Sequence, residues 1–223
     1  MQHKNIVIIG AGDGVSGAFA RKAHAQGANI LLAARNIKKL AGLAKDTKAL
    51  TLSVDATSQV DVARLFAWAD EALGSVDLLL YNPSMRLSVP LLELDPDKAL
   101  DAIKVNAWGA LVAAQEATRR MINQGYGTIL LTGATASIKG GAHSAAFAMG
   151  KFALRGLAQS IARELAPKNI HVAHFILDGQ VGISDDDHLL HPDAVAQTYW
   201  NIATQPRSAW TWEIELRPYV EKF

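Results

Sequence analysis

The chain has no cysteine among its 223 residues, which excludes disulfides, thiol catalysis and Cys-ligated metal sites. It also has almost no excess charge: a formal net charge of +1 gives no electrostatic argument for binding nucleic acid or an anionic membrane. No apolar run approaches the roughly 18 residues of a membrane span, and the run 6–9 is too short for the core of a signal peptide. We therefore expect a cytoplasmic protein that binds neither nucleic acid nor membrane.

Short apolar runs alternate along the chain with longer segments of helical period. This pattern predicts an α/β fold, because strands that are apolar throughout belong to parallel sheets covered by helices on both faces. We expect a Rossmann-type, doubly wound parallel sheet of six to seven strands, in a single domain over residues 1–223. The expected strands are 6–9, 29–33, 50–54, 76–81, 128–131, 171–177 and 211–216. The expected helices are 18–26, 60–73, 96–123 and 144–165, with a short helix after Pro192.

A glycine-rich turn lies between the first expected strand and the first expected helix. Glycines at such a turn let a pyrophosphate approach bare backbone, while the helix N-terminus offers free N–H groups and a positive dipole. Two registers fit, Gly12-x-Gly14-x-x-Gly17 and a looser one in which Gly10, Gly14 and Ser16 hold the key places. A plain structural turn is the alternative, but the strand–turn–helix context favours a nucleotide site. We therefore expect Gly10, Gly12, Gly14 and Ser16 to contact a cofactor.

The end of the second expected strand indicates which dinucleotide is bound. An acidic residue in this place would hold the ribose 2′-hydroxyl of NAD, but the chain here reads A-A-R-N and offers Arg35 instead. A guanidinium can pair bidentately with a 2′-phosphate, which a carboxylate would repel. The alternatives are a solvated surface arginine and, because Asp13 lies in the glycine turn, binding of NAD(H). The residues favour NADP(H), with NAD(H) possible.

Further segments, in order and on the expected elements, resemble the short-chain dehydrogenase/reductase family, and the resemblance covers nearly the whole chain. They are V-D-A-T with Asp55, Y-N-P-S with Asn82, N-A-W-G with Asn106, the strand start at Gly127, and K-F-A-L with Lys151. The resemblance implies that Asp55 meets the adenine and that Asn82 belongs to the cofactor-binding turn. It also implies that Asn106 and Lys151 support a proton relay, and that Lys151 binds the nicotinamide ribose.

The chain departs from the family pattern at the residues that carry the chemistry. The Y-x-x-x-K signature has Phe147 four residues before Lys151, and the catalytic serine aligns with Ala134. The family's tyrosine donates a proton to the carbonyl oxygen, and its serine steadies the developing oxyanion; neither replacement can do this. Such acid–base catalysis typically contributes about 10²–10⁴-fold. Thr135 is the best candidate for a replacement donor, although an ordinary strand-end loop explains this threonine better.

The resemblance implies an NADP(H)-dependent oxidoreductase that acts on an unknown small carbonyl or alcohol through an altered proton relay. The alternative is a non-catalytic NADP(H)-binding sensor or partner subunit. The spacing of histidines and carboxylates gives no reason to expect a metal. Family members pair two long helices, here 96–123 and 144–165, so we expect a homodimer or homotetramer. The small residues that would permit close helix approach are Ala113, Ala114, Ala153 and Ala158.

Overall fold

A computed structural model describes residues 3–222, and a parallel sheet of seven strands runs through its centre. The strand order is β3-β2-β1-β4-β5-β6-β7, and every neighbouring pair is parallel. The strands are β1 (Asn5–Ile9), β2 (Asn29–Ala34), β3 (Leu50–Ser53), β4 (Leu78–Tyr81), β5 (Gly127–Thr132), β6 (Ile170–Leu177) and β7 (Glu213–Leu216). The expected doubly wound parallel sheet is confirmed.

The central strands are apolar along their whole length because both faces of the sheet are covered. Every residue of β1, β4 and β5 is buried. Val7 pairs with Leu79 and packs into the core on one face, whereas Ile8 pairs with Leu80 and packs into the core on the other. Each such side chain contributes about 1.5–3 kcal/mol when fully buried, so the sheet is stable only with helices on both sides.

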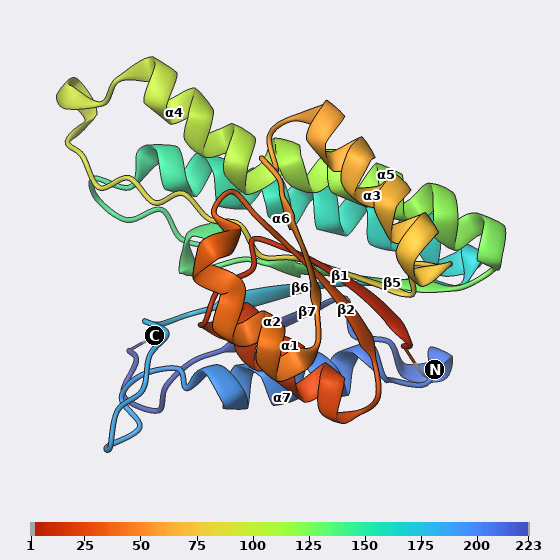
Figure 1. Ribbon diagram of the computed structural model, residues 1–223. Helices are drawn as coiled ribbons and strands as arrows, with labels where there is room; N and C mark the ends of the chain where they lie inside the picture. The colour runs from red at the N-terminus through yellow and green to blue at the C-terminus, as the bar shows by residue number, and fades with distance from the viewer. Residues whose placement is uncertain (1–2, 223) are drawn as a thin grey trace.

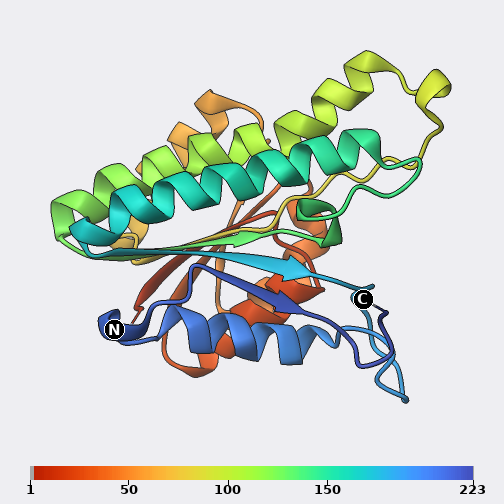
Figure 2. The same ribbon diagram turned by 180° about the vertical axis from the view of Figure 1, so that it is seen from behind.

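Helices form a layer on each face, as Figures 1 and 2 show. The layer on the Val7 face contains α3, α5 and α6, and the layer on the Ile8 face contains α1, α2 and α7. The helices are α1 (Val15–Ala25), α2 (Ala41–Thr47), α3 (Gln59–Leu73), α4 (Pro96–Ile103), α5 (Gly109–Gln124), α6 (Ala145–Leu165) and α7 (Pro192–Ala203). Because β1 leads to α1 on one face and β4 leads to α4 and α5 on the other, the chain diverges at the carboxyl ends of these neighbours. In α/β sheets, ligands bind at such a point.

The long helix expected over residues 96–123 is helical but not uniform. A π-helical turn, η3 (Lys104–Trp108), separates α4 from α5. Within it, the Asn106 side-chain amide donates to the carbonyl oxygen of Ala102 at 2.8 Å. Wide turns of this kind are frequent at functional sites. Hydrophobic period predicts helix over this stretch but carries no signal for a single extra residue in one turn.

Two short elements after β2 were not expected: the 3₁₀ turn η1 (Ile37–Leu40) and the helix α2. Asn36 begins η1 by accepting a hydrogen bond from the Lys38 N–H at 3.1 Å. The last strand is shorter than expected, so Trp212 precedes β7 instead of belonging to it. Within residues 3–222, every helix is too short or too polar to cross a bilayer.

Candidate active site

Two adjoining cavities lie at the carboxyl ends of the strands, with volumes of about 790 Å³ and 530 Å³. Asn82 and Ser84, from the loop after β4, line both. The larger cavity extends over β5 and β6 toward α6 and contains Lys151. The smaller one extends over β1, β2 and β3 and contains Arg35. The two together follow the crevice predicted by the fold.

The glycine turn lies between the cavities: Gly10 and Gly12 line the smaller one and Gly14 the larger. Gly10 has φ of +77°, and a Cβ there would lie 2.5 Å from the nitrogen of Pro83, so a side chain is excluded. A Cβ on Gly17 would lie 2.6 Å from the carbonyl oxygen of Gly12, so this glycine lets α1 pack against the turn. At Gly12 and Gly14 nothing lies within 4 Å of such a Cβ, which leaves the backbone open to a ligand.

Ser16 holds the turn together from beneath. Its side chain is buried, and its Oγ accepts a hydrogen bond from the Gly12 N–H at 3.0 Å. The same hydroxyl can donate to the carbonyl oxygens of Gly10 at 3.3 Å and Gly12 at 3.2 Å. Asn82 adds a link from the β4 loop, with its amide donating to Gly10 at 3.3 Å. Ser16 therefore fixes the backbone of Gly10 and Gly12, which are among the predicted cofactor-binding residues.

Charged side chains of both signs line the smaller cavity. Arg35 follows β2, Lys39 belongs to η1, and Asp55 follows β3. The backbone N–H of Thr57 bonds Asp55 and lowers the pKa of its carboxyl group; partial burial opposes this effect, and the Thr57 hydroxyl and Arg35 add to it. Asp55 is therefore ionised at neutral pH. The segment after β2 contributes Arg35 and Lys39 to the cavity and no acidic side chain.

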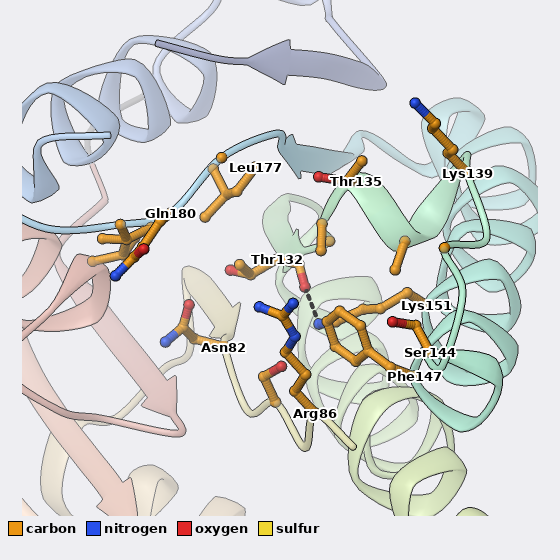
Figure 3. A pocket seen from close by; sticks show the side chains of 18 of the residues that line it. Asn82, Arg86, Thr132, Thr135, Lys139, Ser144, Phe147, Lys151, Leu177 and Gln180 are labelled. Atoms are coloured by element: carbon orange, nitrogen blue, oxygen red, sulfur yellow. Dashed lines mark hydrogen bonds between the residues drawn. The ribbon is translucent and has the colours of Figure 1, made fainter. Parts of the chain in front are cut away.

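Lys151 is the most unusual group in the larger cavity. It is 1% exposed, and its Nζ donates to the Thr132 carbonyl oxygen at 2.8 Å. The ring of Phe147 lies beside it, with its centroid 5.9 Å from Nζ, as Figure 3 shows. Burial lowers the pKa of Lys151 to about 7. An amine with this pKa can both hold and release a proton near neutral pH.

Phe147 and Ala134 line the same cavity as Lys151 and give it apolar wall. Phe147 lies one helical turn before Lys151 on α6, so both side chains reach the same space. Ala134 follows β5 at the start of the turn η4 (Thr135–Ser137). Neither side chain can donate a proton or a hydrogen bond.

Thr135 also lines the larger cavity, and its hydroxyl is committed to a neighbour. Its Oγ1 donates to Asp178 Oδ1 at 2.6 Å, and the second oxygen of Asp178 accepts from Arg217 at 2.8 Å. Thr135 and Arg217 therefore bond to opposite oxygens of the Asp178 side chain. The proton of Thr135 thus points toward a carboxylate, an arrangement that suits passing a proton out of the cavity.

Asn106 lies behind the cavity wall and is fully buried. Its side chain forms two hydrogen bonds with the backbone of Met85: Nδ2 donates to the carbonyl at 2.9 Å and Oδ1 accepts from the N–H at 3.3 Å. Asn106 therefore fixes the loop after β4, which supplies Asn82, Ser84 and Arg86 to the site.

A buried polar cluster supports the turn that carries Ala134. His174 lies 3.4 Å from the Ser137 hydroxyl through Nε2 and 3.0 Å from Glu213 through Nδ1, and Glu213 accepts two bonds from Arg155. Burial lowers the pKa of His174 to about 4, so the imidazole is neutral. The arrangement resembles a hydrolytic triad, but Ser137 is 0% exposed and its Oγ accepts the Ala134 N–H at 3.2 Å. Its role is to position the turn.

Three residues of the site were not predicted from the sequence: Lys39, Arg86 and Arg217. Lys39 enters the smaller cavity through the unexpected turn η1, whose only sequence signal is the capping residue Asn36. Arg86 and Arg217 lie in loops where no motif marks them. Among residues 3–222, no group of three or more histidines and carboxylates is placed to hold a metal ion.

Comparison with known proteins gives a consistent result. Residues 4–179 match the family described as short chain dehydrogenase. A crystal structure of a short-chain dehydrogenase from Rhodopseudomonas palustris is 38% identical, with a TM-score of 0.88 over 97% of this chain and 99% of that one. A metagenomic short-chain oxidoreductase in complex with NADP is 25% identical, with a TM-score of 0.86 over 97% and 98%. An uncharacterized oxidoreductase of Staphylococcus aureus strain USA300 is 28% identical over 225 residues, 96% of this chain and 97% of that protein.

Proposed function

Since the chain belongs to the short-chain dehydrogenase/reductase family, we propose that it is an NADP(H)-dependent oxidoreductase acting on a small carbonyl or alcohol through an altered proton relay. The observation that carries this proposal is the pairing of Lys151 with Phe147 in the larger cavity. A buried, titratable amine lies where substrate can reach it, and the neighbouring ring has no proton to give.

The residues of the smaller cavity fit the phosphorylated end of NADP(H). Arg35 and Lys39 would pair with a 2′-phosphate, and Asp55 lies on the adenine side. The open backbone at Gly12 and Gly14 would receive the pyrophosphate. The related short-chain oxidoreductase that was solved with NADP supports the same choice of cofactor.

Reduction of a carbonyl requires two groups from outside the substrate: a hydride at the carbon and a proton at the oxygen. A bound NADPH would supply the hydride and leave as NADP⁺. We assign the proton to the Lys151 ammonium, which becomes the neutral amine. Phe147 and Ala134 occupy the places of the family's tyrosine and serine, so the usual donor and oxyanion partner are both lacking. Substrates with an activated carbonyl, such as diketones, would depend least on them.

Thr135 offers a second proton route, as an alternative to Lys151. In oxidation a substrate alcohol would donate to Thr135 Oγ1, the threonine would pass its own proton to Asp178, to which it already bonds at 2.6 Å, and a bound NADP⁺ would accept the hydride; in reduction the same groups would act in reverse. Lys151 and Thr135 can be separated by experiment, because Lys151→Arg and Thr135→Val each alter only one of the two routes.

The test is single turnover of bound NADPH with 2,3-pentanedione, measured at several pH values. Only the ammonium form of Lys151 can donate, and its pKa is about 7. The rate should therefore fall about tenfold per pH unit above about pH 7. Lys151→Arg, which stays protonated, should be slower and independent of pH. Thr135→Val should leave the reduction rate within a few-fold of wild type.

Binding of NADPH, followed by energy transfer from tryptophan, is measured alongside to separate cofactor loss from chemical loss. Tight binding without any turnover, at any pH and with diketones, aldehydes, quinones and enones alike, would identify a non-catalytic NADPH-binding protein. Loss of reduction in Thr135→Val with no effect of Lys151→Arg would move the donor to Thr135.

A further inference from the structure

We propose that the substrate carries a carboxylate close to its carbonyl group, and that Arg86 binds this carboxylate in the larger cavity. The inference rests on the proposed oxidoreductase function and names the class of substrate: short 2-oxo or 3-oxo acids, or the corresponding hydroxy acids. Arg86 would be the residue that determines specificity.

The Arg86 side chain is directed into the larger cavity. Figure 3 shows its guanidinium reaching from the loop after β4 toward Thr132, Lys151 and the ring of Phe147. Over residues 3–222, Arg86 has no hydrogen bond and no ion pair. A guanidinium with five N–H donors is therefore available to a ligand at the place where the proposed proton donor lies.

The backbone on both sides of Arg86 is fixed, so its approach to the cavity is built into the fold. Met85, directly before it, is bonded through both its N–H and its carbonyl to the buried side chain of Asn106. Further along the loop, the Val89 N–H donates to the carbonyl of His143 at 2.8 Å. A recognition residue on an anchored loop loses less conformational entropy on binding than one on a free loop.

The charges around the larger cavity are unbalanced toward the positive. Among the described residues, Arg86, Lys139 and, in its ammonium form, Lys151 line it, against the one carboxylate of Glu221. Asp178 does not offset this excess, since Arg217 already pairs with it at 2.8 Å. A neutral substrate would leave the positive charge uncompensated in a partly enclosed space, whereas an anion would neutralise it.

The anion at Arg86 is assigned to the substrate rather than to the cofactor. The cations that suit a 2′-phosphate, Arg35 and Lys39, lie in the smaller cavity, and the shared residues Asn82 and Ser84 lie between them and Arg86. Arg86 instead shares its cavity with Lys151.

The size of the site limits what the anion is attached to. Arg86 and Lys151 point into the same space beside Phe147. A substrate whose carboxylate binds Arg86 and whose carbonyl oxygen lies near Lys151 must therefore have these two groups only a few bonds apart. The planar guanidinium binds a carboxylate bidentately. Leu177 and Val181 line the same cavity and provide apolar surface for a short carbon chain.

The test compares two probes of equal shape, 2-oxobutanoate and its neutral amide 2-oxobutanamide, with saturating NADPH. Wild type should prefer the acid in kcat/KM. Arg86→Gln should lower kcat/KM for the acid roughly 10- to 100-fold and change that for the amide less than threefold. Arg86→Lys should recover part of the loss. The matched control is Arg21→Gln, an exposed arginine on α1, which should change nothing.

A binding measurement keeps this inference separable from the proposed function. Isobutyrate, which cannot be reduced, is titrated into the protein loaded with NADP⁺, and isobutyramide serves as its neutral counterpart. If isobutyrate binds to wild type and this binding is lost in Arg86→Gln, the inference is supported, whether or not the oxo compounds are reduced. Absence of turnover with both oxo compounds would overturn only the oxidoreductase proposal. Equal use of acid and amide by wild type would overturn the inference. So would an equal loss of NADPH affinity in Arg86→Gln, which would assign Arg86 to the cofactor.

Discussion

At the scale of single residues, the proposed reaction depends on Phe147 and Ala134. Both line the larger cavity, so we expect a hydroxyl added to either to face the cavity. Lys151 lines the same cavity, and its Nζ donates a hydrogen bond to the Thr132 carbonyl oxygen at 2.8 Å. If positions 147 and 134 are those of the family's tyrosine and serine, as we propose, the site differs from one with a complete hydroxyl relay by only two oxygen atoms.

We predict that the double variant Phe147→Tyr with Ala134→Ser increases NADPH-dependent reduction of 2,3-pentanedione by roughly 10²-fold over wild type. The tyrosine would supply a better-placed proton, and the nearby Lys151 ammonium would lower the pKa of its hydroxyl. Stability should fall by less than the roughly 1–3 kcal/mol of a buried unpaired hydroxyl, because both groups face the cavity. Initial rates and thermal melts measure the two effects.

Lys151→Met in the same double variant serves as the control and should remove the gain. An unchanged rate in the double variant, with NADPH affinity intact, would show that positions 147 and 134 are not the places of the missing relay.

Sequence patterns placed residues at the cavities where those residues lie on motifs. Lys151 lies on a helix, Arg35, Gly10, Gly12 and Gly14 follow strands at fixed offsets, and all five line the cavities. Arg86 and Arg217 depend on where loops fold back, which no local period encodes. The sequence also indicates Thr135 as a candidate donor, but the bond from Thr135 to Asp178 joins residues 43 positions apart and no local pattern predicts it.

At the scale of elements, the segment after β2 defines the smaller cavity. β2 ends at Ala34, Arg35 follows, and η1 turns the chain so that Lys39 faces the same space. The apolar run predicted the strand, and its end predicted the position of Arg35. The turn η1 was missed because it is four residues long, too short for a helical period to show.

We predict that wild type binds NADPH several-fold more tightly than NADH and that Arg35→Asp reverses this order. A carboxylate there would repel the 2′-phosphate and accept a hydrogen bond from the ribose 2′-hydroxyl. Titration by energy transfer from tryptophan gives both dissociation constants. Lys38→Asp, on the same turn but outside the cavity lining, is the matched charge reversal and should affect both cofactors little. Equal wild-type affinities for the two cofactors would contradict the role of Arg35.

At the scale of the whole molecule, the sheet topology followed from a few general rules. Alternating strands and helices lead to parallel strands through right-handed crossovers, and that is enough to predict a doubly wound sheet with a site at its carboxyl edge. The surface was less predictable. Of the alanines expected to permit close contact between subunits, Ala113, Ala114 and Ala158 are buried against the sheet in this chain. Only Ala153 is exposed.

Large apolar side chains are nevertheless exposed on the first half of α6 and on the adjoining π-helical turn. Trp108, Met149 and Phe152 are 42%, 55% and 45% exposed, and the turn that carries Trp108 packs against α6. Figure 2 shows α6 on the outside of its helix layer, in front of α5. Groups of exposed apolar side chains on a folded protein are typical of a surface that binds another protein. The resemblance to a family of paired long helices makes a second copy of this chain the expected partner.

We predict a dimer or tetramer at micromolar concentration, and we predict that Met149→Glu with Phe152→Glu converts it to a monomer. Two carboxylates placed opposite their own copies across a symmetric interface would repel each other and would have to lose their hydration. Light scattering coupled to size exclusion measures the mass, and circular dichroism establishes that the fold is retained. The matched control is Val60→Glu, which introduces the same charge at a residue 77% exposed on α3, away from this surface, and should leave the assembly unchanged. A wild-type monomer at that concentration, or an equal loss of assembly in the control, would show that α6 is not the interface.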